Sequence, residues 1–335
     1  MVTHSATRSA TRKHRPLPKL TLALACSLTA FIAPMALAQE FPARPITIVV
    51  PVAAGGGTDT LARTLGLRVS ESLKTSVVVE NRLGAGGNIG AEMVARSKPD
   101  GHTLLVTPAT IATNVAVYKK LPYDLMKDFQ AVTLTGETGV VLVVHPSLAA
   151  NNLQEFIALA KAKPGELNYG TAGNGSPQHL HAERFNQFAG IKTNTIPYKG
   201  QSQAMNDLVG GQLHYMFSPI QNALPFIQQG RVRALVVGSS QRHRNLPQVP
   251  SLAESGFKNV EMTNWFVLLA PAGTPMPIIN KLNAEFVKAG NELRAKLEGQ
   301  GFDHLYSTPQ EAMDFMRNEQ TVWTKVVNLA GIVAE

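Results

Sequence analysis

The sequence has 335 residues, of which 44% are hydrophobic, and it carries 31 Lys and Arg against 23 Asp and Glu, a formal net charge of +8. Five of the basic residues stand in the first 38 positions, which contain no acidic residue, so the remaining 297 residues have a net charge of only +3. This small charge, with no stripe of Lys and Arg interleaved with aromatic residues, argues against nucleic acid as a partner. A chain of 297 residues is long enough for two lobes of typical domain size.

Residues 1–38 have the pattern of a cleavable secretory signal peptide. A basic segment precedes an apolar run over 20–33, and Ala36-Leu37-Ala38 has the small-x-small form of a cleavage site. The apolar run is short for a membrane span and is followed by a cleavage pattern, so we expect a periplasmic protein.

The single cysteine of the sequence, Cys26, lies inside this leader. Cleavage after Ala38 would leave a chain without a thiol, which excludes disulfides, a thiolate nucleophile and a Cys-ligated metal. The alternative is lipidation of Cys26, but the preceding Ala23-Leu24-Ala25 has Ala where a lipidation signal needs Leu.

After the leader, apolar runs rich in β-branched residues alternate with amphipathic helices. The run at 46–50 leads through three glycines into a helix with Leu61, Leu65, Val69 and Leu73 on one stripe. Similar runs stand at 76–80, 102–107, 167–172 and 232–240. Strands without alternation are buried on both faces, which is typical of parallel sheets covered by helices. The sequence therefore predicts an α/β fold with mainly parallel sheets.

Several segments carry the capping residues that are typical of helix ends, where a side chain accepts the first N–H groups or a glycine ends the helix. Ser176 with Pro177 is expected to open a helix that closes near Gly190. Capping pairs are expected to open two more helices, at 153–163 and 309–331: Asn152 with Glu155, and Thr308 with Glu311.

Three glycine-rich segments stand between a strand and a helix, at 53–59, 84–90 and 171–176. The first lacks the Gly-Lys-Ser/Thr ending of a phosphate loop. The second has the spacing G-x-G-x-x-x-G, and the next strand ends in Thr107 where a dinucleotide site needs an acidic residue. A nucleotide cofactor is therefore not expected. Unpaired N–H groups at a helix N-terminus instead hold a small anion, and glycines let a carboxylate reach them.

Other candidate groups each have a structural explanation beside a functional one. Asp59 either pairs with the positive end of its helix or bonds to a ligand hydroxyl, ammonium or water. His179 and Glu183 could share a helix face, but no third metal ligand has suitable spacing nearby. Ser176 does not stand in a G-x-S-x-G motif, and no nucleophile, base and orienting group come together. We expect no metal and no catalysis, and keep a metal-binding receptor and an enzyme acting on a carboxylate as alternatives.

The residues just described resemble a known family over nearly all of the chain after the leader. The segments that carry the resemblance include "FPARPITIVVPVAAGGGTDTLAR", "VVVENRLGAGGNIGAEMVA", "GELNYGTAGNGSPQHLHAERF" and "WFVLLAPAGTP". The sequence is similar to the substrate-binding receptors of tripartite tricarboxylate transporters, also called the Bug receptor family. The resemblance implies a two-lobed periplasmic-binding-protein fold, type II-like, that closes on a small organic carboxylate without a cofactor. It also implies transport through the permease subunits of a tripartite transporter, and a monomer is expected.

The resemblance further implies lobe boundaries and ligand-binding positions. The first lobe would comprise residues 39–142 and 265–335 and the second lobe residues 143–264, with the ligand cleft between them. The first glycine loop would supply Ala53, Ala54, Gly55, Gly56 and Asp59, and the third Thr171, Ala172, Ser176 and His179. The remaining expected ligand-binding residues are Tyr198, Gly200, Thr107 and Ser218.

Overall fold

The computed structural model describes residues 1–5, 7, 9–11, 41–198, 200–258, 260 and 262–332. The chain divides into two units, Met1–Glu40 and Phe41–Glu335, and every helix and strand of the described residues belongs to the second. The apolar run, Cys26 and the cleavage site expected in the leader lie outside the described residues. Among the residues that are described, no helix is both long enough and apolar enough to cross a membrane.

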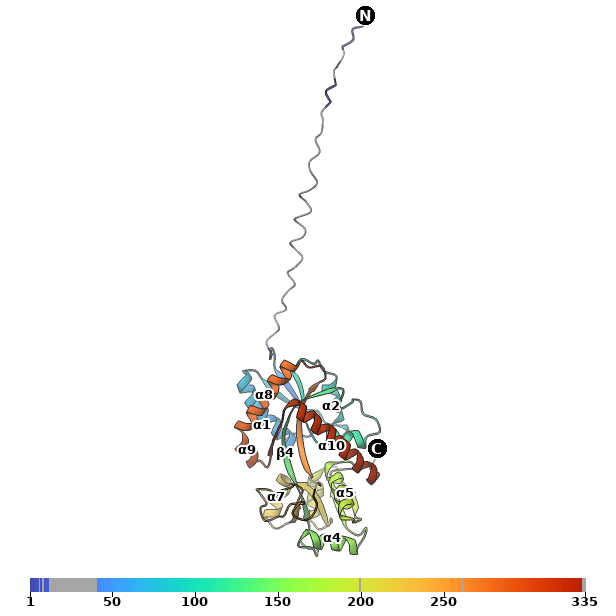
Figure 1. The fold of residues 1–335 in the computed structure, drawn as a ribbon, viewed down its shortest axis with the longest axis vertical. Coiled ribbons are helices and arrows are strands. Elements are labelled where there is room, and N and C mark those ends of the chain that lie inside the picture. Colours follow the sequence, from blue (N-terminus) through green and yellow to red (C-terminus); the bar gives the residue numbers. More distant parts are fainter. Residues whose placement is uncertain are drawn as a thin grey trace. The chain divides into compact units, whose positions relative to one another are not determined.

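The first half of the folded unit alternates strands with helices, as the sequence predicts (Figure 1). Its elements are β1 (Ile46–Val50), α1 (Gly57–Leu73), β2 (Val77–Asn81), the 3-10 helix η1 (Ala85–Gly87), α2 (Asn88–Ala95), β3 (Thr103–Pro108), α3 (Thr110–Val117) and β4 (Phe129–Val144).

The second half continues the alternation and then returns to the first sheet. Its elements are α4 (Leu153–Ala162), β5 (Asn168–Thr171), α5 (Pro177–Ala189), β6 (Asn194–Pro197), α6 (Gln201–Val209), β7 (Tyr215–Pro219), α7 (Ile220–Gln228), β8 (Arg233–Val237), β9 (Thr263–Pro271), α8 (Met276–Glu292), α9 (Arg294–Gly299), β10 (Asp303–Tyr306) and α10 (Pro309–Ala330).

The long strand β4 belongs to two groups of strands. Its first part, 129–139, pairs antiparallel with β9, and its last part, 140–144, pairs antiparallel with β7 and β8. The strands follow the order β2-β1-β3-β9-β4-β7-β5-β6, with β8 and β10 also paired to β4. Figure 1 shows β4 running between the helices α1, α8 and α10 on one side and α4, α5 and α7 on the other. This is a mixed α/β architecture in which one long strand joins two groups of strands, as the expected two-lobed fold requires.

Between the strands just given, parallel pairing occurs in the two sets of strands that are joined by helices. β1 pairs in parallel with β2 and β3, and β5 pairs in parallel with β6 and β7. The parallel pairing expected for the apolar run 232–240 is wrong, because β8 runs antiparallel to β4. The strand expected at 76–80 forms as β2, but it is the edge strand and is only partly buried.

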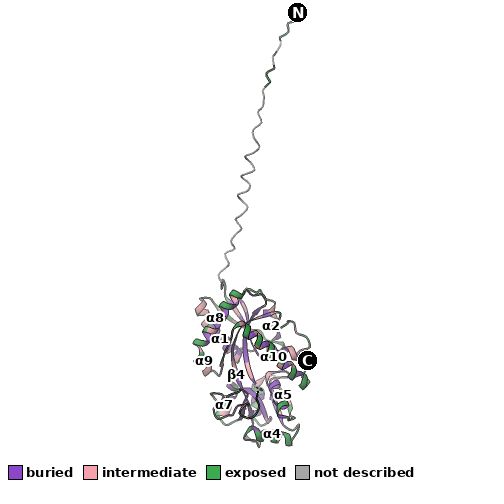
Figure 2. Cartoon of the chain, viewed as in Figure 1, coloured by how far each residue is buried: buried purple, intermediate pink, exposed green. Residues whose placement is uncertain are grey.

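Each group of strands has a hydrophobic cluster on both faces. In the first, Ile48 and Val50 face α1 and α8, whereas Val49 and Leu105 face the cluster that contains Met316 of α10. In the second group, one face packs against α4 and α5 and the other against α6 and α7. Figure 2 shows buried residues concentrated on the strands and exposed residues on the outer surfaces of the helices. The apolar runs are therefore buried on both faces wherever a helix covers each face.

Helix α10, which packs on the first group of strands, also contacts α5, which packs on the second group. Trp323 and Val327 of α10 share a small apolar cluster with Leu180 of α5 and Val117 of α3. The Trp323 ring centroid lies 5.6 Å from that of His181, and the Arg184 guanidinium carbon lies 5.5 Å from the Trp323 ring. The two lobes are thus joined by this contact as well as by β4 and β9.

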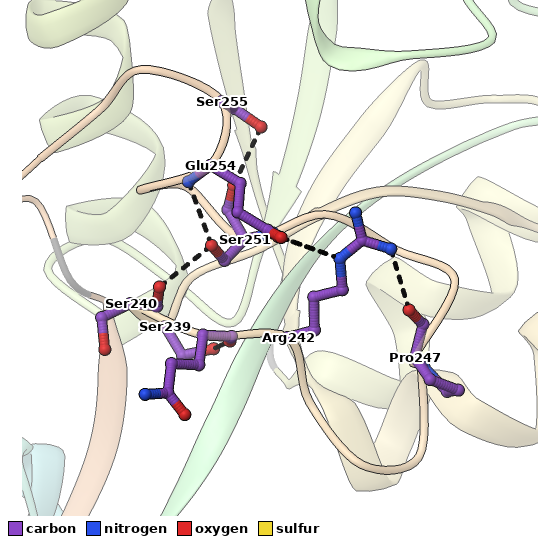
Figure 3. A network of polar contacts seen from close by, with 8 residues as sticks. Ser239, Ser240, Arg242, Pro247, Ser251, Glu254 and Ser255 are labelled. Carbon is purple, nitrogen blue, oxygen red and sulfur yellow. Dashed lines mark hydrogen bonds and ion pairs between the residues drawn. The ribbon is translucent and has the colours of Figure 1, made fainter.

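A polar network orders the connection between β8 and β9 (Figure 3). Arg242 Nε donates to both carboxylate oxygens of Glu254, at 3.1 and 3.0 Å, and its Nη1 donates to the carbonyl of Pro247 at 3.0 Å. Ser251 and Glu254 cap each other's backbone N–H groups. Residues 239–255 of the connection are therefore held together by these hydrogen bonds.

Two of the expected capping arrangements are confirmed in full. Ser176 accepts the N–H of His179, Pro177 is the first helical residue, and Gly190 ends α5. Thr308 and Glu311 form a reciprocal capping box at the start of α10. Asn152 accepts the N–H of Glu155 as expected, but Glu155 accepts the N–H of Asn151.

The capping box of α10 predicts a measurable loss of stability. Thr308→Ala removes the acceptor for the N–H of Glu311, and we expect it to lower the free energy of unfolding by about 1 kcal/mol. Urea unfolding monitored by circular dichroism measures this difference. The control is Thr321→Ala in the same helix, where an exposed hydroxyl donates only to the carbonyl of Arg317. Equal losses in the two variants would contradict the role given to the cap.

Candidate functional site

Helix α1 begins without a side-chain cap. Its N-cap residue is Gly56, and none of the side chains that the structure describes accepts the N–H groups of its first turn, which are those of Gly57, Thr58 and Asp59. The loop residues Ala53, Ala54, Gly55 and Gly56 are all exposed. A Cβ at Gly56 would meet only the carbonyl of Ala53, at 3.4 Å. Unpaired amides, the positive end of the helix dipole and a loop without bulky side chains together suit a small anion.

Asp59 holds this loop in place through hydrogen bonds within the lobe. Its carboxylate accepts the N–H of Gly55 at 2.9 Å, Arg63 Nε at 3.0 Å and Asn81 Nδ2 at 2.9 Å. Burial raises the pKa of the Asp59 carboxyl, but the hydrogen bonds from Arg63, Gly55 and Asn81 outweigh it and hold the pKa below its ordinary value. Both oxygens of Asp59 are engaged and the residue is buried, so it positions the loop that carries the free amides.

The second glycine loop has a different explanation. Gly84, Gly86 and Gly87 adopt positive φ, and a Cβ at Gly86 would lie 2.7 Å from the hydroxyl of Tyr118. The next residue of α2, Asn88, is buried, and its Oδ1 accepts both Asn114 Nδ2 and the Tyr123 hydroxyl. These glycines are required by local packing.

The third glycine loop lies at the start of α5, and its polar groups bond to one another. Ser176 caps the helix, and the N–H of Gly175 donates to His179 Nδ1 at 3.1 Å. An imidazole that accepts at Nδ1 carries its proton on Nε2. Burial lowers the pKa of His179, and the carboxylate of Glu183 offsets only part of that effect, so the ring is neutral near pH 7. His179 therefore offers an Nε2–H donor.

Three helices of the second lobe begin at one edge of its strands. Because β5, β6 and β7 are parallel, the helices α5, α6 and α7 that follow them start at the same carboxyl edge. Gln178 Nε2 of α5 donates to Gln201 Oε1 of α6 at 3.0 Å, and Gln201 Nε2 donates to Ser218 Oγ at 2.7 Å. Helices α6 and α7 also begin without a side-chain cap, after Gly200 and Pro219.

The first turn of α7 lies against the first turn of α1. A Cβ at Gly57 would lie 3.0 Å from Gln221 Nε2 of α7. A second contact joins the third glycine loop to α3, since a Cβ at Gly175 would lie 2.6 Å from Val117. The uncapped start of α1 therefore faces the helix starts of the second lobe.

Polar groups of the remaining residues expected to bind the ligand form hydrogen bonds within the protein. The Tyr198 hydroxyl donates to Asp207 at 2.7 Å, and burial, then Asp207, raise the pKa of Tyr198 to about 12. Thr171 accepts the N–H of Tyr198 through its carbonyl, and Ala172 follows it in the loop. Thr107 is buried at the end of β3, and among the described residues its hydroxyl donates only to the carbonyl of Pro108.

Sequence reasoning missed the glutamines of these helix starts. Gln178 Oε1 and Gln221 Oε1 are buried and have no hydrogen-bond partner among the described residues. A buried acceptor without a partner is costly, so these oxygens suit a water molecule or a ligand donor. The signal in the sequence was a Gln in the first turn of a helix that follows a parallel strand.

The pair His179 and Glu183 does not form a metal site with the described residues. His179 Nδ1 accepts the N–H of Gly175, and Glu183 Oε1 accepts the Tyr169 hydroxyl at 2.5 Å. In the described part of the chain, no three His, Cys, Asp or Glu side chains are placed to hold a metal ion.

Comparisons with known proteins identify relatives over almost the whole chain. The family model of the tripartite tricarboxylate transporter family receptor matches residues 61–332. Protein BugT of Bordetella pertussis is 37% identical over 308 residues, which cover 90% of this chain and 94% of that protein.

Two similar solved structures contain carboxylates. An R. palustris protein with adipate is 34% identical with a TM-score of 0.79, over 88% of this chain and 99% of that chain. MatC from Rhodopseudomonas palustris, with bound malate, is 35% identical with a TM-score of 0.74, over 86% of this chain and 100% of that chain.

The hydrogen bonds of Asp59 predict a pH-dependent contribution to stability. At pH 7 we expect Asp59→Asn to lower the free energy of unfolding by about 2 kcal/mol, because bonds from a charged Arg63 are lost. The pKa of Asp59 is lower in the folded than in the unfolded chain, so this stabilisation exists above the unfolded pKa and is lost as the pH falls through the folded pKa. The difference between variant and parent should therefore shrink below about pH 4.

Urea unfolding of both proteins at several pH values measures this difference. The control is Asp314→Asn, which changes an exposed carboxylate on α10. We expect it to change the free energy of unfolding by less than about 1 kcal/mol. A loss for Asp59→Asn that is the same at acidic and neutral pH would rule out the carboxylate as its cause.

Proposed function

Because the chain belongs to the tripartite tricarboxylate transporter receptor family, we propose that it captures a small organic carboxylate in the periplasm for a tripartite membrane transporter. The family consists of solute-binding receptors, and solved relatives are periplasmic binding proteins. Relatives that hold adipate and malate support a carboxylate as the ligand.

The observation that carries this proposal is the uncapped start of α1 opposite the helix starts of the second lobe. The amides of Gly57, Thr58 and Asp59 would hold one carboxylate of the ligand, and Ala53, Ala54, Gly55 and Gly56 would line its approach. A helix N-terminus binds an anion through N–H donors and its dipole, without a cationic side chain. This grip depends on backbone, so it suits mono- and dicarboxylates alike.

The second lobe would hold the distal part of the ligand. Among the described residues, the groups that remain available there include the N–H groups at the starts of α6 and α7, the His179 Nε2–H and the buried glutamine oxygens. Thr171, Ala172, Ser176, Tyr198 and Ser218 would shape this side of the site, and Thr107 would lie at its margin. A ligand that bonds to both lobes favours the conformation in which the lobes are closed.

The proposal also covers removal of the leader, the boundaries of the lobes, the partners of the receptor and the absence of catalysis. Residues 1–38 would be removed as a signal peptide, residues 39–142 and 265–335 would form the first lobe, and residues 143–264 the second. The receptor would act as a monomer, deliver its ligand to permease subunits and catalyse no reaction.

A thermal-shift screen of residues 39–335 tests the ligand class. Adipate, malate and other mono-, di- and tricarboxylates are compared with the corresponding amides. A ligand at 100 times its Kd adds about 2.7 kcal/mol to the stability of the folded state, which is a clear rise in Tm. We expect at least one acid to raise Tm and its amide to have no effect. Amides that stabilise as well as their acids would contradict an anion site.

Substitution of the glycine that precedes α1 tests the location of the site. Gly56→Val has room for its side chain in the folded protein, because the added Cβ meets only one atom at ordinary contact distance. The valine would instead cover the free amides, so we expect at least a hundredfold loss of affinity, which is about 2.7 kcal/mol. Isothermal titration calorimetry with the acid found in the screen measures the loss.

The matched control for this variant is Gly299→Val, at the end of α9. A Cβ there meets nothing within 4 Å, so the position has room for the side chain as Gly56 does, and Gly299 is not among the residues assigned to the site. We expect the control to bind with parental affinity. If Gly56→Val also binds with parental affinity, the first glycine loop does not hold the ligand.

A further inference from the structure

A cavity lies in the second lobe, at the edge of its strands opposite the helix starts. It has a volume of about 320 Å³, which is within the range of small-molecule sites. Its lining includes His145 after the end of β4, His214 before the start of β7, and Lys163 at the end of α4. The cavity adjoins α4, which lies at the bottom of Figure 1. Since β5 and β7 begin at this edge, the cavity is separate from the helix starts that follow those strands.

Two histidines face this cavity in the same tautomeric state. The backbone N–H of Asn168 donates to His214 Nδ1 at 2.9 Å, and the backbone N–H of Ser147 donates to His145 Nδ1 at 3.2 Å. A backbone N–H can only donate, so both Nδ1 atoms accept and carry no proton. Each ring therefore carries its proton on Nε2. Among the described residues no hydrogen bond involves either Nε2.

The tautomers decide which kind of ligand the cavity suits. A histidine that ligates a metal through Nε2 donates its Nδ1–H to a neighbouring acceptor. Here both Nδ1 atoms face donors, so neither Nε2 is free to ligate a metal. Both rings are instead N–H donors, which is what an oxygen anion requires.

The side chain of Lys163 adds positive charge beside the two rings. Its Nζ lies 3.7 Å from a carboxylate oxygen of Glu166, which also lines the cavity. Both side chains are more than half exposed, so this pair is weak and can be replaced by an incoming anion. Glu166 would compete with that anion for Lys163.

We infer that this cavity is a second binding site, for a small oxyanion of the carboxylate or phosphate type. The Nε2–H groups of His145 and His214 donate to the anion, and Lys163 supplies the charge. The inference does not depend on the proposed function, because it uses none of the residues assigned to the carboxylate receptor site.

Nitrogen-15 NMR of the histidine rings tests this inference, with inorganic phosphate and acetate as separate probes. The titrations use the Gly56→Val variant, so that binding at the start of α1 does not contribute. We expect saturable shifts of the Nε2 signals of His145 and His214, assigned with His145→Gln and His214→Gln. If these shifts saturate with only one of the two anions, that anion is the preferred ligand. If they saturate with neither anion, the inference is overturned.

Charge variants separate a built site from a general effect of charge. We expect Lys163→Gln to weaken binding of the anion that saturates the site roughly tenfold, because the cation beside it is lost. We expect Glu166→Gln to strengthen that binding a few-fold, because the competing carboxylate is lost. The control is Lys161→Gln, which removes the same charge from an exposed position on α4 that does not line the cavity. If Lys161→Gln and Lys163→Gln weaken anion binding equally, the inference is overturned. A titration with zinc chloride is a second test: if zinc removes the Nε2–H signals of the two histidines, the rings bind a metal and the inference is also overturned.

Discussion

The site depends on one unsatisfied end of one helix. Gly56 gives α1 no side-chain cap, so three N–H groups at the positive end of the helix dipole have no partner among the residues that the structure describes. Asp59 occupies the position from which an acidic side chain reaches back to the chain before the helix. It bonds there to the N–H of Gly55 and leaves the first-turn amides free. A carboxylate in the first turn thus orders an anion site without filling it.

In the second lobe, one of the three helix starts that face the ligand site has a side-chain cap, and hydrogen bonds link it to a neighbouring helix start. Ser176 caps α5, and a chain of bonds from Gln178 through Gln201 to Ser218 ties the starts of α5 and α6 to the end of β7. These groups are fixed by one another, which makes the lobe a preorganised surface. The acceptors Gln178 Oε1 and Gln221 Oε1 are left over. A ligand that bridges the lobes would therefore meet donors from α1 and, on the facing helices, these two acceptors together with the N–H groups at the start of α6 and the His179 Nε2–H.

Local features of this fold could be read from the sequence, whereas strand partners could not. Ser176, Gly190 and the Thr308–Glu311 pair mark helix ends through contacts within a few residues, and the structure confirms them. Parallel pairing was inferred from apolar runs, but burial on both faces does not fix strand direction, and β8 packs antiparallel to β4. The glycines at 84–87 were grouped with the other glycine loops that precede helices, but the space beside Gly86 is filled by a distant side chain, Tyr118. The glutamines were missed because only the folded chain shows that their oxygens are unpaired.

The most direct test follows the free amides themselves. In a backbone amide NMR titration of residues 39–335 with adipate and with malate, the account predicts that the N–H signals of Gly57, Thr58 and Asp59 move downfield and saturate with the affinity measured in bulk. Saturable binding of either acid that leaves those three signals unmoved would show that the start of α1 does not hold the carboxylate, and would contradict the account.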